Sequence, residues 1–420
     1  MRILHVNKYL YRRGGAEGYM LDVARLQREA GHEVELFGMQ HPENPAGLPL
    51  ADTFPGLVEL EPAPEGLRAK AAAAARMLWS TSSRSGLSEA IRRFRPDVVH
   101  LHNVYHQLSP SVLHAVRDAG LPSVMTLHDY KLACPSYQML DHGKPCDACV
   151  TGSPVQAARR RCKDGSLTAS TLLAVESTLH RATRAYAPVT ALVCPSEFLA
   201  GVMRQAGVFP ERLHVVPHFV APSDAALPAS PGLGFVFGGR LSHEKGVDTL
   251  VRAVGLAPDV HLDVAGDGPE RAALEALAAQ CAPGRVRFHG RIARDELETL
   301  MRGSLAGVVP SRWYENQPMT VLESMGAGVP VVATTLGGLP ELVRDGVDGW
   351  TVPPDDPQAL ATILQAVAAD PAEARRRGAV GRERMLRDFS ADVHVERLDE
   401  LYRECRAVVA RTSTTTAVTA

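Results

Sequence analysis

The feature that most constrains this chain is a regular alternation of short apolar runs with amphipathic stretches, which stops once and then restarts. The expected strands of the first half are residues 3–6, 33–37, 98–101, 123–127, 191–194 and 213–216. Those of the second half are residues 234–237, 261–264, 286–289, 305–309 and 329–333. Continuous apolar strands separated by helices are typical of parallel sheets covered on both faces. The pattern predicts an α/β protein with two Rossmann-like, doubly wound parallel sheets.

The interruption sets the expected domain limits. Residues 221–233 are rich in proline and alanine and have little that can pack, so we expect a linker there. It would separate a domain at 1–220 from a second at 234–390. A helix at about 390–410 would pack back on the first domain, and 411–420 would form a disordered tail.

Composition excludes several classes of protein. The formal net charge is −2, so the protein as a whole has no electrostatic attraction for nucleic acid. No stretch of 18 residues is apolar and free of charge, so we expect no transmembrane helix. The first ten residues are too polar for a signal peptide. Seven cysteines, an odd number, do not indicate a secreted disulfide scaffold. We therefore expect a cytoplasmic protein, with no prediction of its oligomeric state.

Loops after the strands should carry the function, because doubly wound sheets bind ligands at the carboxyl ends of their strands. Paired glycines such as Gly14-Gly15 and Gly238-Gly239 let a backbone approach a ligand closely. Arg240 and Lys245 follow the second pair and suit phosphate oxygens. The alternative for Lys245 is a surface ion pair with Glu244. Gly266 lies in a third glycine-rich loop, for which a structural role is an equal alternative.

A fourth loop, residues 311–323, combines two carboxylates with a helix start. Glu315 precedes the helix that begins near Pro318, and Glu323 lies within it. A carboxylate accepts hydrogen bonds from two neighbouring hydroxyls, and the free amides of a helix N-terminus bind phosphate. This loop therefore predicts a site for a sugar joined to a phosphate.

These motifs, in this order, resemble those of glycosyltransferase family four, whose members are retaining enzymes of the GT-B fold with a central cleft. The resemblance also includes Gly266-Asp267-Gly268-Pro269, residues 327–333 and Gly337-Gly338-Leu339-Pro340-Glu341. It implies catalytic roles for His128, Arg240, Lys245 and Glu315. The implied donor-binding residues are Gly15, Gly239, Arg240, Lys245, Gly266, Ile292, Glu315, Asn316, Gln317, Met319, Thr320 and Glu323. The residues expected to receive the acceptor are Glu17, His128 and Asp129.

One departure from the family pattern concerns the donor sugar. Family members often have Phe-Gly after the first glutamate, where this chain has Asn316-Gln317. The resemblance further implies same-face displacement, in which the leaving phosphate takes the acceptor proton and catalysis rests on positioning and charge. No cofactor is expected beyond the nucleotide-sugar substrate. The sequence contains no Asp-x-Asp, which argues against a metal-dependent sugar-nucleotide site.

Two clusters of potential metal ligands have alternative interpretations. Cys134, Cys146, Cys149 and Cys162 have spacings that would suit a structural zinc, the alternative being ordinary loop cysteines or a redox-labile pair. His100 and His102 fall on one face of a strand, where we expect packing rather than metal binding.

Donor and acceptor are harder to predict. The alanine- and arginine-rich composition resembles actinobacterial proteins, in which similar enzymes glycosylate aminocyclitols such as 2-deoxystreptamine. We expect a small soluble acceptor, with UDP-N-acetylglucosamine as donor. The alternatives are an exopolysaccharide or lipid-carrier glycosyltransferase, a UDP-sugar epimerase of the same fold, and a non-catalytic nucleotide-binding module. Residues 68–84 would support peripheral membrane contact if they formed one basic amphipathic helix.

Overall fold

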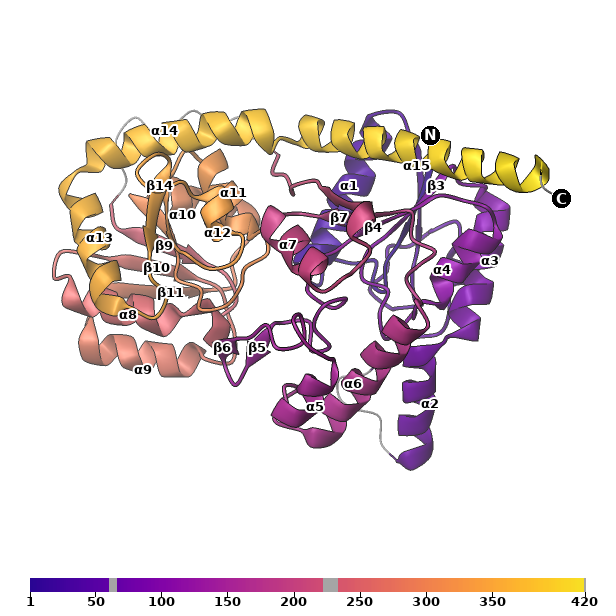
Figure 1. Ribbon diagram of the computed structural model, residues 1–420. Coiled ribbons are helices and arrows are strands. Elements are labelled where there is room, and N and C mark those ends of the chain that lie inside the picture. The colour runs from indigo at the N-terminus through magenta and orange to yellow at the C-terminus, as the bar shows by residue number, and fades with distance from the viewer. Residues whose placement is uncertain (60–65, 222–232, 419–420) are drawn as a thin grey trace.

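Two six-stranded parallel sheets form the framework of the protein (Figure 1). The computed structural model describes residues 1–59, 66–221 and 233–418. The first sheet has the order β2-β1-β3-β4-β7-β8 and the second β11-β10-β9-β12-β13-β14. The first comprises β1 (Arg2–Val6), β2 (Glu33–Phe37), β3 (Val98–Leu101), β4 (Ser123–Thr126), β7 (Ala191–Cys194) and β8 (Leu213–Val215). The second comprises β9 (Phe235–Gly238), β10 (Leu262–Ala265), β11 (Val286–Gly290), β12 (Ala306–Val309), β13 (Val331–Thr334) and β14 (Gly349–Val352).

Helices cover both sheets. Those of the first half are α1 (Gly15–Glu29), α2 (Leu67–Leu78), α3 (Thr81–Phe94), α4 (Ser111–Asp118), α5 (Val155–Arg160), α6 (Leu167–Ala182) and α7 (Glu197–Gln205). Those of the second half are α8 (Val247–Leu256), α9 (Arg271–Cys281), α10 (Arg294–Arg302), α11 (Met319–Gly326), α12 (Leu339–Leu342), α13 (Pro357–Ala369) and α14 (Pro371–Asp388). A last helix, α15 (Ala391–Val418), follows them, and short 3₁₀ helices occupy Ala51–Thr53, Pro210–Arg212 and His243–Lys245.

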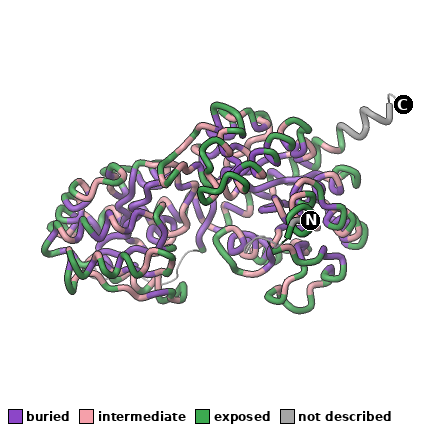
Figure 2. Tube along the Cα trace, turned by 90° about the horizontal axis from the view of Figure 1, so that it is seen from below, coloured by how far each residue is buried: buried purple, intermediate pink, exposed green. Residues whose placement is uncertain are grey.

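Burial explains why the sheets form. Every residue of β3, β4, β7, β12 and β13 is buried, as expected for parallel strands with helices on both faces. Figure 2 shows the buried segments running through the middle of each half, with exposed segments around them. The predicted fold class is therefore confirmed, and most expected strands lie within one or two residues of their predicted limits.

The last helix returns to the first half. Figure 1 shows α14 and α15 crossing from the second sheet to the first along one side of the molecule. Leu398, Leu401 and Tyr402 of α15 are buried in the core of the first half. The helix continues to Val418, past the expected limit at about residue 410. The sequence there has neither glycine nor proline to end a helix.

Three segments differ from the prediction or lie outside the description. Strand β14 was not expected, because it begins with Gly349 and lacks a continuous apolar run. The small hairpin of β5 (Leu140–Asp141) and β6 (Lys144–Pro145) was also missed. Most of the expected linker, residues 222–232, lies outside the described residues.

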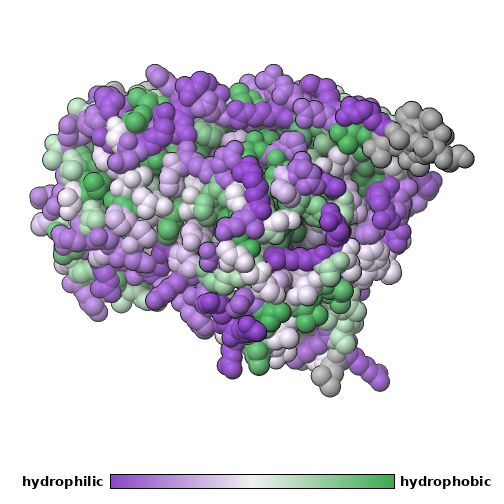
Figure 3. All heavy atoms as spheres, viewed as in Figure 1, coloured by the Kyte–Doolittle hydropathy of each residue, from purple (hydrophilic) through white to green (hydrophobic). Residues whose placement is uncertain are grey.

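The segment proposed for membrane contact is not one helix. Helix α2 ends at Leu78, and the Ser80 side chain caps α3 by accepting a hydrogen bond from the amide of Ser83. Exposed apolar side chains also occur nearby on α6, at Leu167, Val175 and Leu179. Figure 3 shows apolar residues gathered over the α5–α6 region. None of the helices in the described part of the chain is long and apolar enough to span a bilayer.

Candidate active site

Most of the predicted donor residues follow β9 or β12, which are neighbours in the second sheet, while Gly266 and Ile292 follow β10 and β11. Arg240 lies two residues after the end of β9, and Lys245 ends the 3₁₀ turn that comes next. Glu315 lies in the loop between β12 and α11. Parallel strands bring their carboxyl ends to one edge, so residues far apart in sequence meet here.

Lys245 and Glu315 form the centre of this edge. The Lys245 Nζ atom lies 2.7 Å from Glu315 Oε1, and the Ser311 hydroxyl donates to the same oxygen at 2.6 Å. Burial opposes ionisation of Glu315, but the charge and hydrogen bond of Lys245, together with Ser311, outweigh it and lower the pKa of Glu315. Glu315 is therefore an anion at neutral pH. The expected alternative, an ion pair of Lys245 with Glu244, is not formed.

Arg240 contrasts with Lys245. Its side chain is exposed, and it has no hydrogen-bond or ion-pair partner among the described residues. Lys245 instead pairs with Glu315 and also lies over the ring of Trp313, with Nζ 5.2 Å from its centroid. An unpaired guanidinium beside a held ammonium suits recognition of a diphosphate.

Glycines are required where these loops touch. A Cβ atom on Gly266 would lie 1.8 Å from the carbonyl oxygen of Gly239. A Cβ atom on Gly337 would lie 2.3 Å from the carbonyl oxygen of Glu315, which also accepts a hydrogen bond from Gly338 N at 2.7 Å. Any other residue would separate the loops. These glycines thus position the cation-bearing and carboxylate-bearing loops.

The start of α11 supplies amides and a second carboxylate. Met319 and Thr320 form its first turn, where backbone N–H groups have no partner within the helix. Glu323 is one turn further and lies 3.4 Å from the Arg294 guanidinium. Burial raises the pKa of Glu323, and Arg294 partly offsets this effect. Ile292 is half-buried in the loop between β11 and α10.

The first half contributes a pocket of about 410 Å³, here called the N-terminal pocket. Its lining includes Gly14, Glu17, Glu59, Tyr105 and Asp129. It therefore brings together two residues predicted to receive the acceptor. The Tyr105 hydroxyl donates to Asp129 Oδ1 at 2.9 Å, while burial raises the pKa of Asp129. Gly15 begins α1 beside this pocket, and a Cβ on it would meet nothing within 4 Å.

Hydrogen bonds join the two halves around Glu315. The Tyr130 hydroxyl donates to the carbonyl oxygen of Tyr314, and the Ser196 hydroxyl donates to Asn316 Oδ1, both at 2.9 Å. The amide of His218 donates to Gln317 Oε1 at 2.5 Å. Asn316 and Gln317, which depart from the family pattern, thus touch the first half. Atom Nδ2 of Asn316 is buried without a hydrogen-bond partner among the described residues, which leaves a donor for a ligand.

His128 follows β4 and is partly exposed. Its ring stacks on the rings of His102 and His218, with centroids 5.4 and 5.6 Å apart. Its Nε2 atom lies 3.1 Å from His102 Nδ1. Burial lowers the pKa of His128 to about 3, so the ring is neutral at pH 7. A neutral ring recognises a hydroxyl better than it recognises a phosphate.

The cysteine cluster does not support the zinc alternative. Cys134, Cys146, Cys149 and Cys162 surround one small cavity of about 10 Å³, and all four are free. Among the described residues, no three of these sulfur atoms lie within 4.8 Å of one another. Tetrahedral zinc, with Zn–S bonds of about 2.3 Å, needs a closer set.

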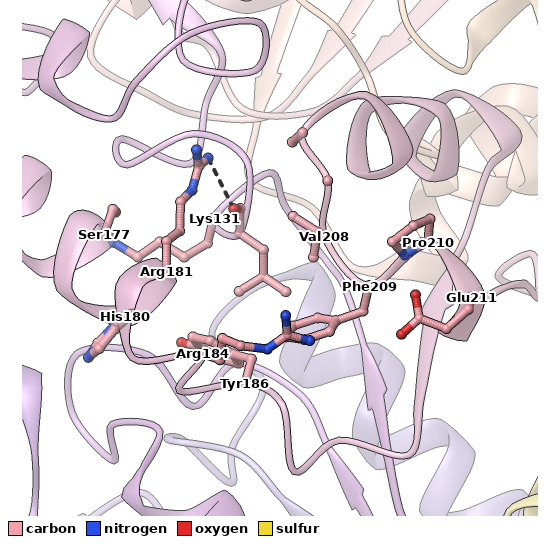
Figure 4. Close-up of a pocket in the computed structure, with 13 residues that line it drawn as sticks. Lys131, Ser177, His180, Arg181, Arg184, Tyr186, Val208, Phe209, Pro210 and Glu211 are labelled. Atoms are coloured by element: carbon pink, nitrogen blue, oxygen red, sulfur yellow. Dashed lines mark hydrogen bonds between the residues drawn. The ribbon is translucent and has the colours of Figure 1, made fainter.

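A further cavity of about 410 Å³ lies away from all the predicted site residues (Figure 4). Arg181 and Arg184 extend from α6 and the turn after it, while Phe209 and Glu211 come from the segment before β8. The Arg184 guanidinium lies over the Phe209 ring, 5.4 Å from its centroid.

Sequence reasoning missed several residues that shape the site. Ser311 holds Glu315, Arg294 faces Glu323, and Tyr105 holds Asp129. Ser311 could have been found, because it lies two residues after a predicted strand, in the same loop as Glu315. Arg294 had no such signal, because its contact with Glu323 depends on how α10 packs beside α11.

Two parallel-sheet α/β halves, with cationic and carboxylate side chains gathered at one sheet edge and a pocket in the other half, define a GT-B glycosyltransferase. The sequence profile described as Glycosyltransferase Family 4 matches residues 13–224, and that described as Glycosyl transferases group 1 matches residues 232–370. The chain belongs to glycosyltransferase family 4.

Curated relatives agree with this assignment. The 2-deoxystreptamine glucosyltransferase of Streptomyces kanamyceticus is 30% identical over 320 residues, which cover 74% of this chain and 78% of that protein. A glycogen synthase of Mycobacterium tuberculosis is 34% identical over 176 residues, covering 40% of this chain and 42% of that protein. The match thus spans less than half the length of the glycogen synthase.

Solved structures share the fold over nearly the whole chain. Sucrose-phosphate synthase from Thermosynechococcus elongatus has a TM-score of 0.72 at 22% identity, covering 97% of this chain and 99% of its own. The Anabaena protein HepE, in complex with UDP and glucose, has a TM-score of 0.66 at 19% identity, covering 96% of this chain and 100% of its own. At these identities the likeness concerns the fold.

Proposed function

We propose that this chain transfers a hexose from a UDP-sugar to a small soluble acceptor, with retention of the anomeric configuration. The leading candidates are N-acetylglucosamine as the transferred sugar and an aminocyclitol such as 2-deoxystreptamine as the acceptor. The relative from Streptomyces kanamyceticus, named as a 2-deoxystreptamine glucosyltransferase, supports this choice of acceptor and adds UDP-glucose as a second donor to test.

The observation that carries the proposal is the placement of Glu315. Its buried carboxylate is held ionised by Lys245, 2.7 Å away, and its loop contacts the first half through Tyr314 and Asn316. A sugar bound to Glu315 would therefore lie at the junction of the two halves. Arg240 and Lys245 would bind the diphosphate, the amides of Met319 and Thr320 would approach it, and Glu323 would hold the ribose.

The acceptor would occupy the N-terminal pocket. Three carboxylates line it, from Glu17, Glu59 and Asp129, and a cationic acceptor would pair with them. The two cations of the pocket, Lys8 and Arg13, both lie over the ring of Tyr9. This arrangement favours an amine-bearing ligand near the carboxylates.

Catalysis would rest on charge placed before the reaction begins. As the bond from sugar to phosphate breaks, negative charge grows on the diphosphate, where Arg240 and Lys245 stabilise it. Each well-placed cation would lower the activation free energy by about 2–4 kcal/mol, as much as an oxyanion-hole donor does. The leaving phosphate would take the acceptor proton on the same face. His128, being neutral, would hold a hydroxyl.

Isothermal titration calorimetry with UDP-glucose, UDP-N-acetylglucosamine and GDP-mannose tests donor binding. Incubation of the bound donor with 2-deoxystreptamine, followed by mass spectrometry and proton NMR, tests transfer and the anomeric configuration. We expect binding of a UDP-sugar and an α-linked product. The proposal is wrong if none of these sugar nucleotides binds.

The same assay separates the alternatives. A UDP-sugar epimerase would convert the donor without any acceptor, and a nucleotide-binding module would bind it without turnover. A lipid-carrier enzyme would leave 2-deoxystreptamine unmodified but glycosylate a membrane extract. The exposed apolar side chains on α6 are the observation that favours this last alternative.

A further inference from the structure

Five histidine rings lie in contact beneath the proposed sugar site. Neighbouring ring centroids are 4.4 to 5.6 Å apart. The five are His5, His100, His102, His128 and His218. Burial lowers the pKa of His5 to about 4 and those of His100 and His102 well below the ordinary value. All are neutral at pH 7, so each ring has one N–H donor and one acceptor nitrogen.

Hydrogen bonds fix which nitrogen of each ring carries the proton, and the direction is set at Gln27. Its amide Nε2 donates to the Tyr402 oxygen at 3.0 Å, which turns the Gln27 carbonyl toward His5. The Tyr402 hydroxyl then donates to His100 Nδ1 at 2.6 Å, and His100 Nε2 donates to Thr126 Oγ1 at 2.7 Å.

The last three bonds lead to the site. Gln27 Oε1 accepts from His5 Nε2 at 2.7 Å, and His5 Nδ1 accepts from His102 Nε2 at 3.0 Å. His102 Nδ1 is then an acceptor, and His128 Nε2 donates to it at 3.1 Å. His128 Nδ1 is left with a lone pair and without a partner among the described residues. The ring is partly exposed at the junction of the halves.

We propose that this directional chain of hydrogen bonds holds His128 in one tautomer, with Nδ1 as a hydrogen-bond acceptor for a hydroxyl or amine of the bound substrates. Its members, here called the histidine chain, are Thr126, His100, Tyr402, Gln27, His5, His102 and His128. Gln27 and Tyr402 act through other residues and are positioning residues. The role toward substrate rests on the proposed function, whereas the tautomer itself does not.

A metal site is the competing explanation for part of the chain. Potential ligand atoms of His5, His100 and His102 lie within 4.8 Å of one another. Every ring nitrogen of these three residues, however, already has a hydrogen-bond partner. Binding a metal would break these hydrogen bonds and leave buried groups, such as the Gln27 carbonyl, without a partner. Each buried polar group left without a hydrogen bond costs free energy, so the hydrogen-bonded network is favoured. The prediction that His100 and His102 pack rather than bind metal agrees with this arrangement.

Nitrogen-15 NMR of histidine-labelled protein tests the chain without any substrate. The ring-nitrogen shifts of His128, assigned by their loss in His128→Asn, report directly which nitrogen is protonated. We expect a single tautomer with the proton on Nε2. Protonated Nδ1 in the wild-type protein would overturn the proposal. If the expected tautomer is found but no UDP-sugar binds, the chain stands and the proposed function fails.

Two variants remove one hydroxyl each. Tyr402→Phe frees the Gln27 amide to turn over, and Thr126→Val removes the oxygen that accepts the proton of His100 Nε2. In either variant we expect His128 to become a mixture of tautomers, about half of each if neither direction is favoured, with kcat/KM for the sugar nucleotide lowered about twofold. Using both keeps the test decisive if one fails to fold.

The matched control is Tyr186→Phe, which also removes a buried tyrosine hydroxyl from the first half. That hydroxyl has no hydrogen-bond partner among the described residues and lines the separate cavity of Figure 4. We expect the control to leave the His128 spectrum and kcat/KM unchanged. A single unaltered tautomer in folded Tyr402→Phe and Thr126→Val would refute the chain, since a merely structural network would affect stability alone.

Discussion

Replacing Lys245 with Met should turn Glu315 from a stabilised anion into a buried charge without a partner. The Glu315 side chain is 6% exposed and that of Lys245 is 23% exposed. Removing one partner of a fully buried pair costs about 3–5 kcal/mol. Because Lys245 is partly exposed, we expect a smaller cost than for a fully buried pair, about 2–3 kcal/mol at pH 7.

The sign of the pH dependence follows from the two pKa values. In the wild-type protein the pKa of Glu315 is lowered, so its contribution to stability is present above the unfolded value of about 4.3 and is lost as pH falls through the folded value. In Lys245→Met, burial dominates and raises the folded pKa above the unfolded one. The cost is then greatest at neutral pH and is relieved by protonation. The stability difference between the two proteins should shrink as pH falls from about 7 to about 4.

Urea unfolding, followed by tryptophan fluorescence, measures this difference, because Trp313 and Trp350 both lie in the second half. The informative comparison is the double variant Lys245→Met with Glu315→Gln, in which a neutral amide replaces the orphaned carboxylate. We expect it to recover most of the lost free energy of unfolding while turnover stays at least about 100-fold below wild type. No recovery at pH 7, or a difference independent of pH, would refute the role given to Lys245.

Three other outcomes follow from the site. Arg240→Ala should change the free energy of unfolding by less than about 0.5 kcal/mol, since the side chain has no partner in the described structure, yet weaken UDP binding about tenfold or more by calorimetry. Gly266→Ala should destabilise the protein by more than about 3 kcal/mol in urea unfolding, because its Cβ would meet the Gly239 carbonyl oxygen at 1.8 Å. Glu323→Gln should weaken UDP binding about tenfold. It should not lower the free energy of unfolding at pH 7, because burial already disfavours the charged form of Glu323. Uracil has no ribose, so an equal loss of affinity for uracil would rule out contact between Glu323 and the ribose.

Local patterns were enough to predict the two sheets. The strands of the interior are short and mostly apolar, and such runs are buried between helices. Strand β14 was not predicted because it lies at the edge of its sheet, where less apolar residues such as Gly349 and Thr351 are tolerated. The helical end of α15 was not predicted because its polar, threonine-rich composition is typical of a tail, although it contains no residue that ends a helix.

The site was only partly predictable for a different reason. Arg240, Lys245 and Glu315 were visible because each follows a strand whose place in the sheet was predictable. The partner of Lys245 was not, since Glu244 is its neighbour in sequence and Glu315 is 70 residues away. The histidine chain depends on Gln27 and Tyr402, 375 residues apart and on the helices α1 and α15. Which side chains meet across such distances is set by packing, not by local pattern.

The position of the histidine chain relates it to domain motion. The amide of Val220, where the protein chain leaves the first half, donates to the carbonyl oxygen of Phe389, where the protein chain returns to it. A pivot between the halves would lie near this pair. The histidine chain, from Gln27 to His128, instead lies on α1, β1, α15 and the ends of β3 and β4 in the first half. Because α15 belongs to the first-half core, the pivot can turn without breaking the bonds between Gln27, Tyr402 and His100. The tautomer of His128 should therefore be the same in open and closed forms, and a substrate would meet a ring whose acceptor nitrogen is already in place.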